Sequence, residues 1–202
     1  MGACGGAEVN RGLDVAIAGL GLVLSSPVLA AGALAVKLEG SGPVLYRQLR
    51  VGKDGVDFEL LKLRTMVVGA ETQGAGFAVD KGDSRITKTG RLLRRLSVDE
   101  LPQLWNVVRG DMSVIGPRPT LRYQVDAYDD EQLHRLDVKP GITGWAQIHG
   151  RAALPWAERI ELDLWYVRHH DWKTDLLILL RTPLALFGGT YKGRSGGWQQ
   201  PS

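Results

Sequence analysis

The pattern of hydrophobic and polar positions along this chain is dominated by one apolar segment near its start. From Leu13 to Val36 the only charged residue is Asp14. A straight helix of that length would extend ~36 Å, against a bilayer hydrocarbon core of ~30 Å. The segment is therefore long enough to cross a membrane, and its composition predicts contact with lipid.

Pro27 interrupts this segment at its centre, within the sequence LSSPVL. Proline lacks a backbone donor and its ring clashes with the carbonyl four residues earlier, so the helix must kink or end there. Ser25 and Ser26 can hydrogen bond the freed carbonyls. The two arms reach only ~20 and ~15 Å, and neither spans a bilayer alone. We therefore predict a re-entrant membrane hairpin over residues 1–38, bent at Ser26-Pro27.

Basic residues flank the segment on both sides. Arg11 precedes it, and Lys37, Arg47, Arg50 and Lys53 follow it. Because positively charged flanks stay in the cytoplasm, both ends should lie at the cytoplasmic face. Three other interpretations remain open: a kinked helix that spans the bilayer, a cleaved secretory signal ending among the small residues 31–35, and a buried core helix.

The rest of the chain, residues 39–202, predicts a single α+β domain that is mostly helical and contains a small β-hairpin. Two strands lie between Val44 and Met66, joined by a turn over Gly52–Gly55. A short helix, a break near Ser97 and a second helix that ends by Gly110 come next. Later elements are a strand before Gly116, a solvated acidic helix over 126–137, a strand after Pro140, a helix over about 155–170, and a last helix from Thr174 that Pro183 limits.

Composition adds modest constraints. The chain has 202 residues, a formal net charge of +3 and one cysteine, Cys4. The mild basicity favours anionic partners without choosing among nucleic acid, phosphorylated metabolites and lipid headgroups. A single cysteine allows no intrachain disulfide, which favours a reducing, cytosolic setting. The C-terminal third contains four tryptophans, Trp145, Trp156, Trp165 and Trp172. They predict interfacial helices, although a tryptophan-rich soluble core fits equally well.

The main chemical candidate is the acidic pair Asp99-Glu100. Pro102 follows directly and is best tolerated in the first turn of a helix, so the pair lies near a helix start. Backbone N–H groups there attract anions, including phosphate. The competing interpretation is purely structural, because Ser97 and Glu100 have the spacing of a capping box.

Basic residues surround this pair in the sequence and favour the chemical interpretation. Lys62 and Arg64 end the predicted hairpin, Arg94 precedes the pair, and Arg118 follows in the proline-rich turn Gly116–Pro119. Cations that neutralise phosphate oxygens, with carboxylates able to hold Mg²⁺, are what phosphoryl transfer requires. A solvated basic face is the alternative.

These segments resemble the bacterial sugar transferase family, the monotopic phosphoglycosyl transferases. The similar stretches are Ser26-Pro27, KLRTM (Lys62–Met66), the long segment Ser84–Pro119 and PGITGWAQIHGR (Pro140–Arg151). These stretches occur in the same order as in the family and extend over nearly the whole chain, so the resemblance is specific. It implies a monotopic protein at the cytoplasmic face of the bacterial inner membrane, with residues 39–202 as its cytosolic catalytic domain.

The resemblance also implies a mechanism. Asp99 would attack the sugar-linked phosphate of a UDP-sugar, release UMP and form a phosphosugar-aspartyl intermediate, which polyprenyl (undecaprenyl) phosphate would then attack. Asp99 would also contact Mg²⁺, and Glu100 would assist as the second catalytic residue. Substrate-binding roles fall on Lys62, Arg94, Arg118 and Arg151. The expected partners are the UDP-sugar, polyprenyl phosphate and membrane lipids, and no nucleic acid.

Two other functions stay open at this level. A membrane-anchored basic binding module would not need Asp99 at all. A Mg²⁺-dependent phosphohydrolase would use the same acidic pair to transfer phosphate to water.

Overall fold

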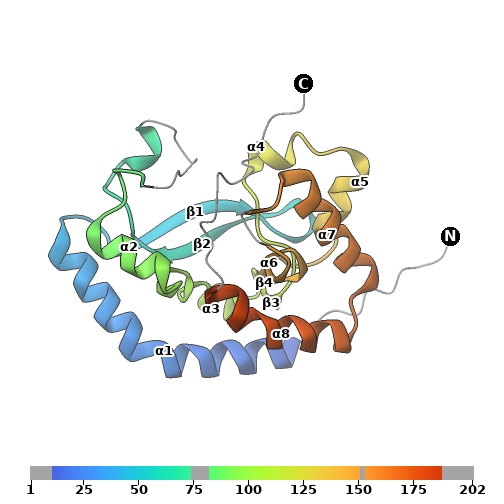
Figure 1. Ribbon diagram of the computed structural model, residues 1–202, viewed down its shortest axis with the longest axis horizontal. Coiled ribbons are helices and arrows are strands. Elements are labelled where there is room, and N and C mark those ends of the chain that lie inside the picture. Colours follow the sequence, from blue (N-terminus) through green and yellow to red (C-terminus); the bar gives the residue numbers. More distant parts are fainter. Residues whose placement is uncertain (1–10, 74–81, 151–152, 188–202) are drawn as a thin grey trace.

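The computed structural model describes residues 11–73, 82–150 and 153–187. Its elements surround two small sheets, and the long helix α1 (Arg11–Glu39) runs along one side of the molecule (Figure 1). The predicted class, mostly helical with one small hairpin, is confirmed.

Helix α1 continues through Pro27 rather than ending there, so the predicted break is a bend inside one 29-residue helix. Figure 1 shows this bend near the middle of α1. The hydroxyl of Ser26 donates to the carbonyl of Val23 at 2.8 Å. That carbonyl lies four residues before Pro27 and is the one whose amide partner the proline lacks. The helix therefore tolerates the proline because a side chain replaces the missing donor.

Among the described residues, α1 is the one helix long and apolar enough to cross a membrane by length and composition. Only 11% of its most apolar window is buried, which disfavours the buried core helix. Large apolar side chains are exposed along both arms: Leu13, Leu20, Val23, Leu24, Val28, Leu34 and Leu38.

Both ends of α1 are bound to the same domain. Near the first end, Asp14 is buried and accepts hydrogen bonds from Ser113 Oγ at 3.0 Å and Val114 N at 2.9 Å. At the other end, Glu39 accepts from the backbone N–H of Lys88 at 2.7 Å, in the first turn of α2 (Lys88–Arg95). Arg64 also donates to the Gly40 carbonyl at 3.0 Å.

The predicted hairpin is formed by β1 (Leu45–Val51) and β2 (Asp57–Leu63), joined across the 3-10 turn η1 (Lys53–Gly55). The antiparallel register pairs Tyr46 with Lys62, Gln48 with Leu60 and Arg50 with Phe58. Residues directly opposite each other project from the same face of a sheet. Gln48, Arg50 and Lys62 therefore share one face of the hairpin.

The predicted helix–break–helix is also present. A 3-10 turn, η3 (Val98–Glu100), separates α2 from α3 (Gln103–Arg109). Ser97 marks the break with a left-handed backbone at φ 54°, and Pro102 is the N-cap of α3. Gly110 ends α3 in the left-handed conformation that favours glycine at this position.

Two close contacts fix these helices on the hairpin. The side chain of Asn106 in α3 is fully buried, accepts from Leu61 N at 3.0 Å and donates to Glu59 O at 2.7 Å. It therefore bonds the β2 backbone as a neighbouring strand would. Helix α2 packs directly on the strand exit, because a Cβ on Gly90 would lie 2.0 Å from the Thr65 carbonyl.

The short strands predicted before Gly116 and after Pro140 are present as β3 (Ser113–Ile115) and β4 (Gly141–Thr143). The two strands pair in parallel. The single acidic helix predicted over 126–137 is wrong. The segment holds α5 (Asp130–Leu133) and the 3-10 turn η4 (His134–Leu136), and α4 (Arg122–Val125) precedes it. Asp129 starts a new helix by accepting from Gln132 N at 2.8 Å, which divides the segment.

The remaining elements are η2 (Ala70–Thr72), α6 (Trp145–Ile148), α7 (Trp156–His169) and α8 (Trp172–Phe187). Helix α7 matches its predicted range. Pro183 lies inside α8 and does not limit it, contrary to the prediction. The helical turn that precedes Pro183 is fixed by Thr182. Its Oγ1 donates to the Ile178 carbonyl and forms a hydrogen bond with Thr143 Oγ1, both at 2.7 Å.

The core has two clusters, and α1 contributes to both. Ala18 of α1 lies in the larger cluster with Leu60, Val107, Tyr166 and Ile178 among others. Val36, near the end of α1, packs in the smaller cluster with Leu63 and Leu93. The apolar helix is thus part of the core on one side and exposed on the other.

Candidate active site

The acidic pair lies in η3, one short turn before α3. The competing capping-box interpretation is wrong, because the Ser97 side chain makes no capping hydrogen bond and its backbone is left-handed. Glu100 is turned toward basic side chains instead. This local geometry leaves the pair available for chemistry.

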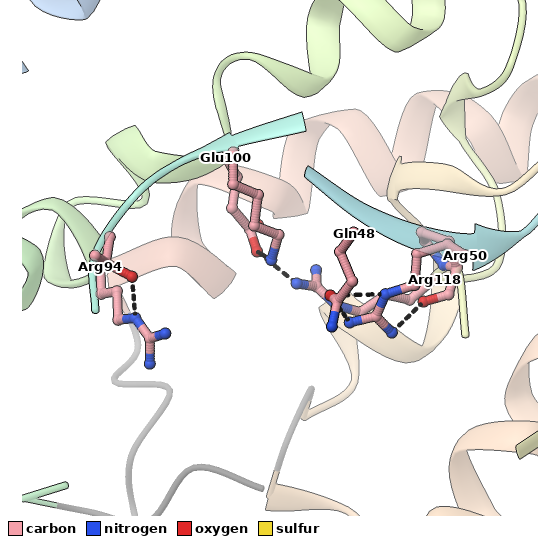
Figure 2. Close-up of polar contacts among 8 residues, drawn as sticks. Gln48, Arg50, Arg94, Glu100 and Arg118 are labelled. Atoms are coloured by element: carbon pink, nitrogen blue, oxygen red, sulfur yellow. Dashed lines mark hydrogen bonds and ion pairs between the residues drawn. The ribbon is translucent and has the colours of Figure 1, made fainter. Parts of the chain in front are cut away.

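Three distant segments meet at Glu100. Its Oε1 lies 3.3 Å from the Nζ of Lys62, and the same oxygen forms an ion pair with Nη2 of Arg118. Figure 2 shows Glu100 pointing toward Arg118. The Lys62 and Glu100 side chains are about a fifth exposed, at 20% and 21%, whereas Arg118 is 47% exposed. The structure therefore brings together three of the residues that the sequence nominated.

Asp99 is adjacent but differently placed. It is only 7% exposed, and among the residues that the structure describes its carboxylate has no hydrogen-bond or ion-pair partner. The carboxylate is held in a cationic environment without being neutralised by any direct contact. An unpaired carboxylate keeps its lone pairs available for attack or for a metal ion.

The two neighbouring carboxylates titrate in opposite directions. Burial raises the pKa of Asp99, and the charge of Glu100 raises it further, against the opposing effect of Lys62, Arg94 and Arg118. Burial also acts to raise the pKa of Glu100, but the attraction of Arg118 and Lys62 outweighs it and the net pKa is lowered. Paired acids whose environments separate their pKa values are typical of catalytic sites.

The basic residues also perturb one another. Burial lowers the pKa of Lys62, and Glu100 opposes that change. Burial and the charge of Arg118 lower the pKa of Arg50 to about 10. Several cations held close together form a site that favours a polyanion such as a diphosphate.

Arg50 and Gln48 belong to this cluster, and the sequence analysis did not nominate them for the site. Arg50 donates to Gln48 Oε1 through Nε at 3.0 Å and Nη2 at 2.6 Å, and to the Pro119 carbonyl through Nη1 at 3.2 Å (Figure 2). The signal that could have found them is the hairpin register, because they alternate along β1 on the face that carries Lys62.

Arg94 and Arg64, which were also nominated, bond to groups other than Glu100. Arg94 donates to Thr65 Oγ1 at 2.8 Å and lies apart from Arg118 in Figure 2, although its charge acts on the pKa of Asp99. Arg64 donates to Ser41 O and Gly40 O near the end of α1, so it is not part of the cluster. Arg151 lies outside the described residues.

The donor set of this site suits only one kind of metal. Among the described residues there is no group of three or more His, Cys, Asp or Glu side chains that could hold an ion by itself. Mg²⁺, however, is commonly bound by one or two carboxylates together with water and substrate phosphates. Asp99, unpaired and next to an anion-binding cluster, fits a Mg²⁺ ion that shares its ligands with a substrate phosphate.

Over 189 residues the chain is 43% identical to the UDP-N-acetylgalactosamine-undecaprenyl-phosphate N-acetylgalactosaminephosphotransferase of Aeromonas hydrophila, covering 91% of this chain but 44% of that protein. It is 44% identical to the UDP-glucose:undecaprenyl-phosphate glucose-1-phosphate transferase of Caulobacter vibrioides, covering 86% of this chain and 67% of that protein.

A third relative matches over most of its own length as well. The exopolysaccharide production protein ExoY of Rhizobium meliloti is 36% identical, with 92% of this chain and 89% of that protein covered. The model of the family described as bacterial sugar transferase matches residues 6–189. The chain therefore belongs to the bacterial sugar transferase family.

Proposed function

We propose that this protein is a phosphoglycosyl transferase that moves a sugar 1-phosphate from a UDP-sugar to polyprenyl (undecaprenyl) phosphate. The activities for which the Aeromonas and Caulobacter relatives are named support both substrates. The single observation that carries the proposal is the buried carboxylate of Asp99, unpaired within the described part of the chain, beside a cluster of cations that includes Lys62 and Arg118.

In the proposed first step, a carboxylate oxygen of Asp99 attacks the sugar-linked phosphorus of the UDP-sugar. The new Asp99–phosphorus bond forms as the bond to the UMP oxygen breaks, and UMP leaves with that electron pair. In the second step an oxygen of polyprenyl phosphate attacks the same phosphorus, and the Asp99 carboxylate is restored. Burial makes Asp99 less well solvated and therefore a better nucleophile when it is ionised.

The cations solve the electrostatic problem of this reaction. A carboxylate and a diphosphate repel each other unless charge is withdrawn from the phosphate oxygens. Lys62 and Arg118 are held close to Asp99 by their ion pairs with Glu100. We assign Glu100 the role of keeping these donors in place until phosphate binds.

Asp99 would also hold Mg²⁺. When bound, the ion supplies further withdrawal of negative charge from the phosphate oxygens. The protein's own contribution is to present an unpaired carboxylate next to Lys62 and Arg118.

The test is to incubate the purified protein with a panel of UDP-sugars and Mg²⁺ and to measure UMP with and without undecaprenyl phosphate. We expect at most one UMP per protein without the lipid and repeated turnover with it. Mass spectrometry before the lipid is added should find a phosphosugar adduct on Asp99, and none in Asp99→Asn.

Other outcomes would identify the alternative functions. Repeated turnover without lipid, with sugar phosphate as product, would indicate a phosphohydrolase. No UMP with any donor, and unchanged lipid binding in Asp99→Asn, would indicate a binding module and would overturn the proposal.

We further propose that α1 is re-entrant and places Asp99 at the cytoplasmic face of the inner membrane. Asp14 and Glu39, near opposite ends of α1, bind the same domain, and the exposed side chains between them are apolar. A helix that spanned the bilayer would place its ends at opposite faces of the membrane, where one domain could not bind both.

Helix α8 supports the same orientation. Its exposed side chains Trp172, Leu176, Leu180 and Leu184 recur every four residues, which places them on one face. Such a face suits the membrane interface. Of the four tryptophans predicted to be interfacial, Trp172 is the most exposed at 71%, whereas Trp145 stacks on Trp165 at 4.6 Å.

Cysteine labelling tests the topology. With Cys4 replaced by serine, cysteines are placed singly at Gly12 and Gly40, beyond the two apolar arms. An impermeant maleimide should label both positions in inside-out vesicles and neither in right-side-out vesicles. Labelling of the two positions in opposite preparations would show a spanning helix.

A further inference from the structure

We propose that Arg135, with its buried partner Asp163, is a positioning residue for Arg118. It acts by holding the backbone of the turn from which the Arg118 side chain projects. The inference depends on the proposed function only where it assigns Arg118 a phosphate-binding role.

Arg135 lies in η4, away from the acidic pair in the sequence, and is 5% exposed. Its Nε donates to Asp163 Oδ2 at 2.7 Å, and Asp163 is 2% exposed. Its Nη2 donates to the carbonyl of Arg118 at 2.7 Å. A planar guanidinium fixed on one edge by a carboxylate presents its other N–H groups in fixed directions.

The rest of the Arg135 guanidinium is also engaged. Nη1 donates to the hydroxyl of Tyr128 at 2.7 Å and lies 3.4 Å from Thr120 Oγ1. The side chain therefore joins η4 and α7 to the turn that carries Arg118. Of the contacts that hold this turn, Arg135 supplies the one made to Arg118 itself.

The turn is held at four consecutive carbonyls. Those of Pro117 and Thr120 accept from backbone N–H groups of Gly141 at 2.8 Å and Val51 at 3.0 Å. The carbonyl of Pro119 accepts from Arg50 at 3.2 Å. The Arg118 carbonyl accepts from Arg135, and this bond acts on the residue whose side chain reaches Glu100.

Stability alone gives no reason for this ion pair. Removing two charges from water costs about as much as their attraction returns, so well-packed apolar residues would serve the fold equally well. What an apolar pair cannot supply is a directed donor to the Arg118 carbonyl. A long, half-exposed side chain such as Arg118 needs a fixed backbone if it is to meet a phosphate in one geometry.

Arg135→Lys is the informative variant. A lysine keeps its charge beside Asp163, but one ammonium group cannot reproduce the guanidinium fork. The matched control is Arg122→Lys, because Arg122 likewise joins a carboxylate, Asp57, to a backbone carbonyl, Gly55, at 2.7 Å each. Each change is made in the full chain and again in Arg118→Ala.

Two readouts are taken. The first is kcat/KM for UMP release, and the second is the affinity for inorganic pyrophosphate by calorimetry. With Arg118 present, Arg135→Lys should lower both by roughly 10- to 100-fold. In the Arg118→Ala background it should change them by less than about twofold, because residues that act through one another are not additive. Arg122→Lys should match the wild type.

Equal losses with and without Arg118, or no loss at all, would overturn the inference. If Arg135→Lys lowers the melting temperature so far that it cannot be assayed, Asp163→Asn takes its place, with the same pattern expected. A wild type that releases no UMP but binds pyrophosphate in an Arg135-dependent way would refute the proposed function and retain the inference. A wild type that does neither would refute both.

Discussion

Asp99 carries a cost to the fold that its proposed role explains. Its carboxylate is buried with no partner among the described residues, and burial raises its pKa, so the ionised form destabilises the folded state. That penalty is fully present above the raised pKa of the folded state and disappears below the pKa of the unfolded state. Sites built for chemistry commonly retain such costs.

Asp99→Asn should therefore abolish UMP release while raising the melting temperature. We expect a gain of about 2–4 °C at pH 7.5, the shift that ~1 kcal/mol gives in a chain of this size, and a gain that shrinks as the pH falls toward 4. Thermal unfolding in nanodiscs at both pH values measures it.

Glu100→Gln is the matched control and should have the opposite sign. Arg118 and Lys62 lower the pKa of Glu100, so ionised Glu100 stabilises the fold, and this contribution is lost as the pH falls. Its replacement should lower the melting temperature at pH 7.5. Equal destabilisation by both substitutions would contradict this account of Asp99.

Glu100→Gln should also move the acid limb of the pH profile of kcat/KM. The charge of Glu100 raises the pKa of Asp99, and its removal leaves the opposing effect of Lys62, Arg94 and Arg118. The pKa of Asp99 should fall, so activity should persist to lower pH than in the wild type. Asp57→Asn, a change at an acid paired with Arg122, should leave the limb in place. An unmoved limb in Glu100→Gln would show that Asp99 is not the titrating group.

At the scale of elements, the bend in α1 depends on one hydroxyl. Ser26→Ala leaves the Val23 carbonyl without a donor, which in lipid should cost about 1–3 kcal/mol. Ser25→Ala is the control, because its contact with Leu22 O is 3.5 Å long and weak. In Pro27→Ala the backbone N–H returns, so the effect of Ser26→Ala should disappear. Unfolding measurements in nanodiscs distinguish these cases, and a Ser26 effect that survives Pro27→Ala would contradict the explanation.

The sequence allowed most elements to be predicted where their signals are local. Pro102, Ser97 and Gly110 mark helix boundaries that the structure confirms. Predictions failed where tertiary contacts or caps decide, as at Asp129, which starts a second helix, and at Pro183, which α8 accommodates. Asn106, whose side chain replaces a strand neighbour, has no local signal.

The same limit applies to the site. The acidic pair, Lys62 and Arg118 could be nominated from charge and from the family resemblance. The sequence suggests that Arg64 accompanies Lys62, because residues two apart on a strand share a face. Strand β2 ends at Leu63, however, so this alternation does not extend to Arg64. Arg135 could not be found from the sequence, because its role depends on a backbone carbonyl brought close only by the fold.

At the scale of the whole molecule, α1 and α8 give it one apolar side. Leu180→Glu with Leu184→Glu should weaken association with lipid vesicles by about tenfold or more, because each buried leucine contributes roughly 1.5–3 kcal/mol. Leu133→Glu, at an exposed leucine of α5 on the opposite side of Figure 1, should have no such effect. Flotation assays measure the bound fraction. Equal loss in both variants would show that α8 has no special role.

The participation of α1 in both core clusters has a practical consequence for anyone who wants a water-soluble version of this enzyme. Deleting the apolar N-terminal helix would remove Ala18 and Val36 from the core. It would also remove the Glu39 carboxylate, which accepts a hydrogen bond from the first turn of α2. The truncated protein would expose the hydrophobic surfaces that α1 covers, and it would aggregate. Solubilisation should instead recode the outward-facing leucines and valines and keep the inward ones, since the anchor is not a detachable part.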